Sequence, residues 1–245
     1  MSKQVGAFIT TCEEDVRWAA QLLAEVERMG IPFSVHFDRC SQSTVDGMAL
    51  HHLCVGYTRQ DDPSVEYTEM HKQGALDILS REGFDWALHW DADETWEKLG
   101  PTKLQDVVAK HDAADYLKVL WLNLWGDKDH IRVDTLFNHP PRVKLYNLQH
   151  DVRTGARRRW MFDHKITYGC KMADKDGRPM NGVGDCVQTD LACLHHGNMT
   201  REMREFHKAR WDRIYTQAVG NNPYGFWNYQ LDEVNHPPTV IDNLY

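Results

Sequence analysis

Short apolar runs and one amphipathic stretch alternate along the first forty residues. Residues 4–10 form an apolar run of strand length, and residues 33–37 form a second one. Between them, apolar residues recur at helical spacing over 16–29, and Thr11 with Glu14 makes a capping-box sequence ahead of that helix. This strand–helix–strand pattern predicts two parallel strands joined by a right-handed crossover.

The alternation continues to about residue 125. A short strand is predicted at 53–57, inside the polar and irregular stretch 41–64. Phe84–Trp90 is rich in apolar and aromatic residues, as expected of a strand buried at the centre of a sheet. The other expected elements are helices over 65–81 and near 102–112, and a strand over 116–124. Strands alternating with helices predict an α/β fold with a mostly parallel central sheet.

The alternation breaks down after about residue 126. The stretch 169–190 is rich in glycine and aspartate, and we expect it to be a long loop. A helix is expected over 200–219, and strands over 142–148 and 158–162. We therefore expect a single domain, residues 1–245, with two halves, residues 1–125 and 126–220, followed by a tail at 221–245.

The composition is that of an ordinary globular protein. Of 245 residues, 42% are hydrophobic and 26% are charged, which rules out wholesale disorder. Lys and Arg number 28 against 36 Asp and Glu, and the net charge of -8 argues against a generally basic, nucleic-acid-binding surface. No apolar run is long enough for a membrane span or a signal-peptide core. Six scattered cysteines without a C-x-x-C pair favour free thiols in a reducing compartment, so we expect a cytoplasmic protein.

Two carboxylates, Asp91 and Asp93, directly follow the apolar strand Phe84–Trp90. Open α/β sheets bind ligands at the carboxyl ends of their strands, and residues i and i+2 of an extended segment point the same way. Two carboxylates facing one pocket repel each other unless a cation lies between them. Oxygen ligands of this kind suit Mn²⁺ or Mg²⁺, which can also bridge a diphosphate. The alternative is a solvated acidic turn, and the third carboxylate, Glu94, weighs against it.

The sequence HWDADETWE around these carboxylates resembles the D-x-D motif of nucleotide-sugar glycosyltransferases with the GT-A fold, particularly the family 2-like group. LHHG at 194–197, followed by KARW at 208–211, is similar to the late H-x-G…K-x-R-[YW] element of that group. The resemblance covers about residues 4–215 and implies a Rossmann-like, three-layer α/β/α sandwich. By this resemblance, residues 1–125 bind the nucleotide-sugar and residues 126–220 form the acceptor side.

The resemblance also implies a metal-dependent transferase that takes a sugar from a nucleoside-diphosphate donor, UDP-linked by the family pattern. Mn²⁺ or Mg²⁺ would be held by Asp91 and Asp93, assisted by one of two histidines, His195 or His196. Each histidine is alternatively an ordinary surface or partly buried residue. The residues that would contact the donor nucleotide are Thr10, Thr11, Asp38, Lys72 and Asp91.

The base that deprotonates the acceptor hydroxyl is less clearly marked. Inverting members of the family often carry an E-D pair after the D-x-D, and this chain has none there. Asp163 and Asp185 are the candidates, and a turn residue is the alternative for each. A retaining enzyme would need no such base.

The acceptor predicted by the resemblance is a saccharide or another hydroxylated molecule. The basic run Arg157–Trp160 allows a minority interpretation, in which the acceptor is a hydroxymethylated pyrimidine in DNA. The acidic net charge of the chain argues against it. A solvated strand edge explains the same run more simply. The sequence carries no signal of the oligomeric state.

Two other classes of function remain open. A nucleotidyltransferase that makes a nucleotide-sugar uses the same carboxylate and metal chemistry. That class usually has a glycine-rich, basic loop after its first strand, and ITTCEED at 9–15 has none. A non-catalytic carbohydrate-binding module is the other alternative, and the presence of Asp91, Asp93 and the late histidines argues against it.

Overall fold

The structure is a computed structural model, and it describes residues 3–62, 71–133, 141–150, 155, 157–162, 170–173, 185–219, 231, 233 and 239–242. The chain divides into two compact units that are interleaved along the sequence. Unit 1 comprises Met1–Ala92, Leu99–Val119 and Arg142–Leu191, and unit 2 comprises Asp93–Lys98, Leu120–Pro141 and Ala192–Tyr245. Each unit is described separately below.

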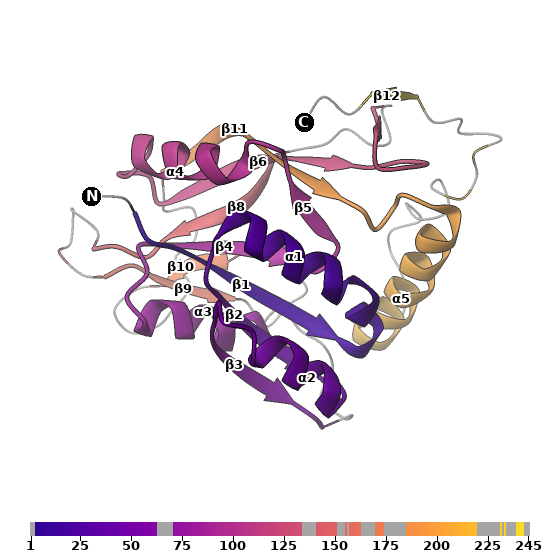
Figure 1. The fold of residues 1–245 in the computed structure, drawn as a ribbon, viewed down its shortest axis with the longest axis horizontal. Coiled ribbons are helices and arrows are strands. Elements are labelled where there is room, and N and C mark those ends of the chain that lie inside the picture. Colours follow the sequence, from indigo (N-terminus) through magenta and orange to yellow (C-terminus); the bar gives the residue numbers. More distant parts are fainter. Residues whose placement is uncertain are drawn as a thin grey trace. The chain divides into compact units, whose positions relative to one another are not determined.

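Four parallel strands form the centre of unit 1, in the order β3-β2-β1-β4 (Figure 1). The strands β1 and β2 are buried along almost their whole length, as their continuous apolar runs predict. All four strands are close to the predicted positions: β1 (Val5–Cys12), β2 (Phe33–Asp38), β3 (Cys54–Gln60) and β4 (Trp86–Asp91). The predicted strand–helix–strand unit is therefore confirmed.

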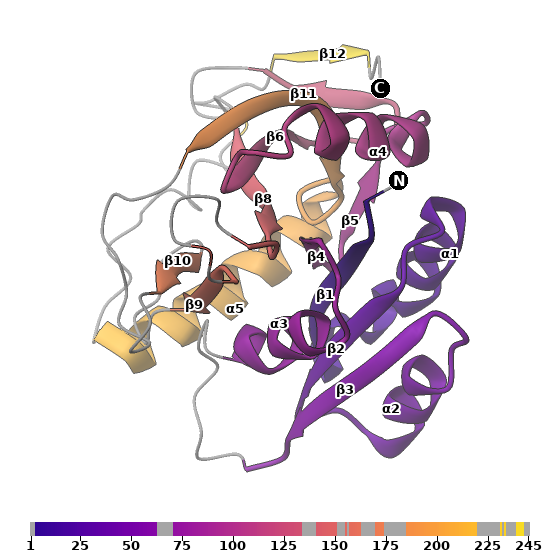
Figure 2. The ribbon, with the colours of Figure 1, turned by 90° about the vertical axis from the view of Figure 1, so that its left-hand side faces the viewer.

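Helices cover this parallel sheet. α3 (His71–Arg81) packs on one face, where the Ser34 hydroxyl donates a hydrogen bond to the Ala75 carbonyl over 2.7 Å. α1 (Ala19–Met29) and α2 (Gln42–Ala49) lie on the other side of the strands (Figure 2). α4 (Gly100–Lys110) also belongs to unit 1 and matches the helix predicted near 102–112.

Two local predictions are wrong at the start of the chain. Thr11 lies inside β1 rather than at a helix cap, and the helical region begins with the 3-10 segment η1 (Glu13–Trp18), whose N-cap makes no side-chain bond. The strand continues through the predicted cap, so the capping box does not form. The stretch predicted to be irregular contains α2, which begins after the N-cap Ser41.

The sheet is mixed, and the prediction of a mostly parallel sheet is wrong beyond β4. β8 (Arg142–Asn147) pairs antiparallel with both β4 and β6 (Tyr116–Asn123), and it separates them. The eight strands follow in the order β3-β2-β1-β4-β8-β6-β11-β5. A two-stranded antiparallel pair, β9 (Arg159–Phe162) and β10 (Cys170–Ala173), also belongs to unit 1.

Unit 2 contains short strands and one long helix. β5 (Glu94–Trp96) pairs antiparallel with the end of β11 (Cys186–His195), and β7 (His130–Arg132) pairs with β12 (Val240–Asp242). β10 and β11 occupy part of the stretch predicted to be a loop at 169–190, whereas α5 (Arg201–Val219) matches its prediction. Among the described residues, no helix combines the length and the apolar character that a membrane crossing needs.

Candidate active site

A row of polar side chains crosses the four parallel strands of unit 1. Thr10 of β1 pairs with His36 of β2 on one side and with Asp91 of β4 on the other. His36 in turn pairs with Thr58 of β3. Neighbouring residues of parallel strands point to the same face, so these four side chains form one row near the carboxyl ends of the strands. This is the edge at which open α/β sheets bind ligands.

His36 occupies the middle of this row and is neutral at neutral pH. Its Nδ1 lies 2.8 Å from the Thr58 hydroxyl, and its ring stacks on His71 with ring centroids 5.0 Å apart. Burial, reinforced by the charge of His71, lowers the pKa of His36 to about 4. The stacked pair of rings lies near Asp38, where the resemblance places the nucleoside, and the His36 ring adds no charge there at neutral pH.

Asp91 is engaged by basic side chains of unit 1. Its Oδ2 accepts a hydrogen bond from Lys144 Nζ over 2.8 Å, and its Oδ1 lies 3.2 Å from His89 Nε2. Burial acts to raise the pKa of Asp91, but the charges of Lys144, His89 and Lys72 hold it well below its ordinary value. Asp91 is thus an ion-paired carboxylate, and the predicted donor residue Lys72 is one of the charges that act on it.

The predicted nucleoside residues lie at the ends of β1 and β2. Asp38 is almost fully buried and accepts two hydrogen bonds from the Arg39 guanidinium, over 3.0 Å from Nε and 2.7 Å from Nη2. Thr10 and Thr11 are also buried. The structure therefore brings Thr10, Thr11, Asp38 and Asp91 to the same edge of the parallel strands.

Three ligand side chains converge in unit 2. Asp93 follows β4, His195 ends β11, and His207 lies on α5. Asp93 Oδ2 is 3.1 Å from His195 Nε2 and 3.6 Å from His207 Nε2. One ligand atom from each residue lies within 4.8 Å of the others. We call these three residues the Asp93 cluster.

The surroundings of His195 fix the role of its ring nitrogens. His195 Nδ1 lies 2.8 Å from Asn123 Oδ1, and the same oxygen accepts a hydrogen bond from Asn198 Nδ2 over 3.0 Å. An amide oxygen only accepts, so the His195 ring donates its Nδ1 proton to Asn123. His195 Nε2 then faces Asp93 Oδ2, and two acceptors at this distance need a proton or a cation between them. Metal-ligating histidines typically make such a bond through the other ring nitrogen.

Gly197 forms one wall of the Asp93 cluster. A Cβ atom at this position would lie 2.1 Å from His207 Cε1, 2.5 Å from Asp93 Oδ2 and 2.9 Å from His195 Cε1. Real Cβ contacts are never this short, so the backbone approaches all three side chains as closely as glycine alone permits. The glycine of the LHHG sequence is therefore part of the site.

The remaining histidine and carboxylate of the two motifs point elsewhere. His196 Nε2 lies 2.8 Å from the Thr95 hydroxyl, and the His196 main-chain N–H donates to the Asp93 carbonyl over 2.8 Å. Glu94 is fully buried and accepts a hydrogen bond from Trp121 Nε1 over 2.8 Å. The structure thus brings His195, and not His196, to the Asp93 carboxylate.

The Asp93 cluster fits a divalent cation. Neighbouring ligand atoms of an octahedral ion with bonds of about 2.1 Å lie about 3 Å apart, and those of a tetrahedral ion about 3.4 Å apart. The distances of 3.1 and 3.6 Å from Asp93 Oδ2 are close to both values. Two imidazoles and one carboxylate suit Mn²⁺ better than Mg²⁺, because Mg²⁺ prefers oxygen ligands.

The two candidate bases differ in what the structure says of them. Asp163 lies outside the described residues. The Asp185 carbonyl accepts a hydrogen bond from the Tyr116 N–H over 3.4 Å, and Tyr116 is level with Ala87 because both pair with Tyr146. Asp91 is four residues further along β4, roughly 13 Å at the usual rise per residue. The structure therefore does not bring Asp185 near Asp91.

The basic run that begins just before β9 makes contacts inside unit 1. The Arg157 guanidinium donates to the Leu148 and Phe84 carbonyls, both over 2.9 Å, and Arg158 forms a buried ion pair with Asp115 at 2.7 Å. A cavity of about 340 Å³ lies beside the residues that precede β4. It is lined by Gly83, Phe84, Asp85, Leu148, Gln149, His150 and Arg157. None of the predicted site residues lines this cavity, and two of the three arginines do not form an exposed basic surface.

Two site residues escape the sequence motifs. His207 immediately precedes the KARW sequence, but its partner Asp93 is far away in the chain, so only its place beside the late motif could have indicated it. Lys144 lies in an alternating strand and carries no local signal. Both residues acquire their role through long-range pairing.

Comparison with known proteins gives matches only among solved structures, since no family model and no curated protein matches the chain. Residues 1–349 of S. aureus TarS match 94% of this chain and 70% of that chain, with 14% identity and a TM-score of 0.48. S. aureus TarS matches 95% of this chain and 43% of that chain, with 11% identity and a TM-score of 0.47. The complex of residues 1–349 with UDP-GlcNAc matches 94% and 71%, with 11% identity and a TM-score of 0.45.

Proposed function

We propose that the protein is a metal-dependent glycosyltransferase with a GT-A-like α/β/α fold. It transfers a sugar from a nucleoside-diphosphate donor, UDP-linked as the sequence resemblance implies, to the hydroxyl of a saccharide or another hydroxylated acceptor. The observation that carries this proposal is the Asp93 cluster. It combines a carboxylate of the D-x-D sequence with a histidine of the late motif, as the resemblance implies for a metal site.

Asp93, His195 and His207 would hold the metal ion in this proposal, and Mn²⁺ fits their mixed oxygen and nitrogen ligands. A bound divalent cation supplies positive charge to the departing diphosphate. The Asn123 amide keeps the His195 ring in the orientation that presents Nε2 to Asp93. Gly197 keeps a side chain out of the space between the ligands.

The carboxyl edge of the parallel strands would hold the donor nucleotide. Thr10, Thr11 and Asp38 contact the nucleoside in this assignment, and the neutral His36 ring lies in the same row. Lys72 and Lys144 place two positive charges around Asp91, which suits a site for a diphosphate. Asp91 holds Lys144 through a direct ion pair and remains a predicted donor-binding residue.

Asp163 is the better candidate for the base, because Asp185 lies at the other end of β4. Phe162, the residue before Asp163, packs edge-on against Phe8, with ring centroids 5.8 Å apart. Phe8 also stacks on His89, the partner of Asp91, with centroids 5.1 Å apart. The residue preceding Asp163 therefore belongs to the same side of unit 1 as the proposed donor site. We do not propose DNA as the acceptor, because Arg157 and Arg158 bind groups within the protein: the Leu148 carbonyl and the Asp115 carboxylate, respectively.

The test is incubation with a panel of nucleotide-sugars and Mn²⁺, with separate detection of nucleoside diphosphate and pyrophosphate. Release of nucleoside diphosphate, and its increase on adding saccharide acceptors, is the expected result. Pyrophosphate release would indicate a nucleotidyltransferase instead, and donor binding without turnover would indicate a binding module.

The matched variants are Asp93→Asn and Asp190→Asn. Asp93→Asn removes one charged ligand while keeping the side-chain shape, so Mn²⁺-stimulated turnover should fall at least 100-fold. Asp190 is an exposed carboxylate that pairs with Lys103 at 3.2 Å, and its replacement should leave turnover unchanged. Full Mn²⁺-stimulated activity in Asp93→Asn would contradict the assignment of the site.

A further inference from the structure

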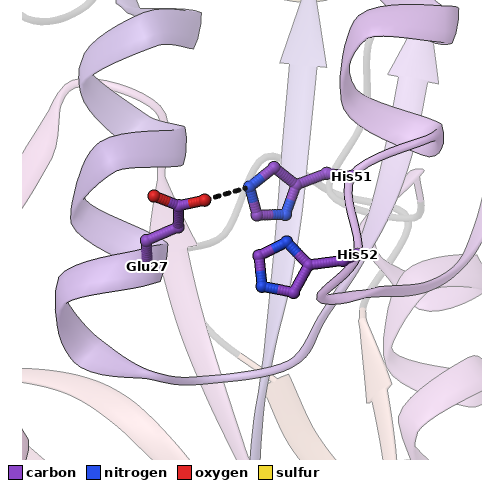
Figure 3. A group of neighbouring side chains, drawn as sticks. All are labelled: Glu27, His51 and His52. Atoms are coloured by element: carbon purple, nitrogen blue, oxygen red, sulfur yellow. Dashed lines mark hydrogen bonds and ion pairs between the residues drawn. The ribbon is translucent and has the colours of Figure 1, made fainter.

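A second group of metal-ligating side chains lies in unit 1, and the proposed glycosyl transfer makes no use of it. Glu27 is in the last turn of α1, and His51 and His52 are in the turn between α2 and β3. Figure 3 shows the Glu27 carboxylate reaching from α1 toward the two imidazole rings of the turn. We call these three residues the Glu27 cluster.

One distance within the Glu27 cluster matches that between two ligands of one ion. His51 Nε2 lies 3.2 Å from Glu27 Oε1, and one ligand atom from each of the three residues lies within 4.8 Å of the others. Two ligands bound about 2.0–2.1 Å from a tetrahedral Zn²⁺ are about 3.3–3.4 Å apart. The His51 and His52 rings stack with centroids 4.7 Å apart, so the exposed His52 side chain would have to rotate for its nitrogen to bind the same ion as His51.

The cluster combines one fixed ligand with two accessible ones. The His51 side chain is only 12% exposed and its ring packs against Phe33, with centroids 5.8 Å apart. The Glu27 side chain is 57% exposed, and His52 is exposed as well. Glu27 also lies where α1 ends at the left-handed Gly30, and the carbonyl ends of a helix favour a cation.

We propose that Glu27, His51 and His52 bind a divalent transition-metal ion of the zinc type, with water completing the coordination. Two imidazoles and one carboxylate are a ligand set that Zn²⁺ accepts. In the absence of the ion, the Leu53 N–H donates to His51 Nδ1 over 3.3 Å, which leaves the ring proton on Nε2, facing Glu27. The ion replaces that proton, the proton moves to Nδ1, and the long hydrogen bond from Leu53 is given up. The bound ion thus ties the end of α1 to the turn before β3.

The experiment counts the zinc ions bound by the full chain. Zn²⁺ is titrated into the protein in competition with a chromophoric chelator, and Co²⁺ is used in parallel because its visible spectrum reports coordination by nitrogen and oxygen ligands. We expect two ions for the unmodified chain, one for Asp93→Asn, one for His52→Gln and none for the double variant. His51 is kept because it packs against Phe33.

The matched control is His130→Gln. His130 Nδ1 lies 2.8 Å from Asp127 Oδ1, so it is an exposed histidine paired with a carboxylate, and the described residues around it form no three-ligand group. This variant should keep both ions, whereas Glu27→Gln should weaken the second ion at least tenfold. Zn²⁺ should also raise the unfolding temperature of Asp93→Asn, and His52→Gln should abolish that increase.

The two proposals fail in different ways. If His52→Gln and Glu27→Gln retain the same zinc affinity and stoichiometry as the unmodified chain, the Glu27 cluster does not bind zinc. If Asp93→Asn loses no ion, the Asp93 cluster is the one that fails. Neither result depends on measuring glycosyl transfer.

Discussion

Gly197→Ala tests the geometry of the Asp93 cluster more sharply than removal of a ligand. All three ligands stay in the chain, and only one methyl group is added. That methyl would lie 2.1 Å from His207 Cε1 and 2.5 Å from Asp93 Oδ2. Non-bonded carbon atoms need about 3.5 Å, so His207 or the turn at Gly197 has to move by roughly 1.4 Å.

A displacement of this size is large for a metal site. Ligand distances are held to about 0.2 Å, so a shift of roughly 1.4 Å leaves at most two of the three ligands in place. We expect Mn²⁺ affinity to fall at least 100-fold, and Mn²⁺-stimulated release of nucleoside diphosphate to fall with it. The overpacked turn should lower the free energy of unfolding by about 1–3 kcal/mol, which leaves the protein folded.

The assays are Mn²⁺ binding, followed through the electron paramagnetic resonance of the free ion, and donor turnover at saturating Mn²⁺. Gly47→Ala is the matched control, because Gly47 lies inside α2 and no atom lies within 4 Å of an added Cβ. It should bind Mn²⁺ normally and gain up to about 1 kcal/mol of stability, since alanine favours the helix. Normal Mn²⁺ binding by Gly197→Ala would refute the assignment of these three residues as a metal site.

Three further predictions concern the Asp93 cluster and the polar residues near the carboxyl ends of the parallel strands. Mn²⁺ should stimulate turnover at least tenfold more than Mg²⁺ at equal free concentration, because two of the three ligands are nitrogens; equal stimulation would count against the Asp93 cluster. Lys144→Met should raise the pKa of Asp91, measured by carboxyl NMR titration, and raise the donor KM; with the Asp91 side chain 38% exposed, the cost in stability should be only about 1–2 kcal/mol. Burial lowers the pKa values of His36 and His89 to about 4, so between pH 6.5 and 4 the unfolded chain binds protons that the folded chain does not. The free energy of unfolding should therefore fall as the pH drops through this window, by up to about 1.4 kcal/mol per pH unit for each histidine, and His89→Gln should remove one such contribution in urea denaturation curves.

Local patterns in the sequence predict the parallel strands well. Apolar runs of strand length identify β1, β2 and β4. A strand that is buried on both faces is apolar along its length, so it appears in the sequence as a continuous apolar run. The capping box fails because β1 continues through Thr11, and α2 is missed because its sequence is largely polar. In the first case strand pairing overrides a local preference, whereas in the second the prediction omits a local signal, the N-cap Ser41.

The mixed sheet lies beyond local patterns. The strand predicted over 142–148 is confirmed as β8 (Arg142–Asn147), but nothing in its sequence indicates that it pairs antiparallel between β4 and β6. Strand order depends on contacts between distant segments, and those contacts leave no periodic signal. The prediction of a mostly parallel sheet assumes that the parallel pairing of the first four strands continues in the later strands.

The site shows the same division. The D-x-D sequence and the late histidines indicate Asp93 and His195, whereas His207 emerges only when α5 is folded beside them. The sequence leaves both His195 and His196 as candidates, and only the structure shows that His195 Nε2 lies 3.1 Å from Asp93 Oδ2 while His196 Nε2 contacts the Thr95 hydroxyl. Sequence motifs thus indicate which residue types could form the site, and the fold shows which of those residues lie close together.

The Asp93 cluster has a mechanical consequence for unit 2. Asp93 and His195 are separated by 102 positions, and His195 and His207 by 12, so one bound ion would cross-link three segments that are covalently far apart. Because the ion would bind only the folded arrangement of these three ligands, its binding free energy would add to the free energy of unfolding. A bound ion should then slow amide hydrogen exchange in the first turns of α5, which carry His207. The fraction of protein with bound metal would then determine the local stability of α5 as well as the rate of the proposed glycosyl transfer.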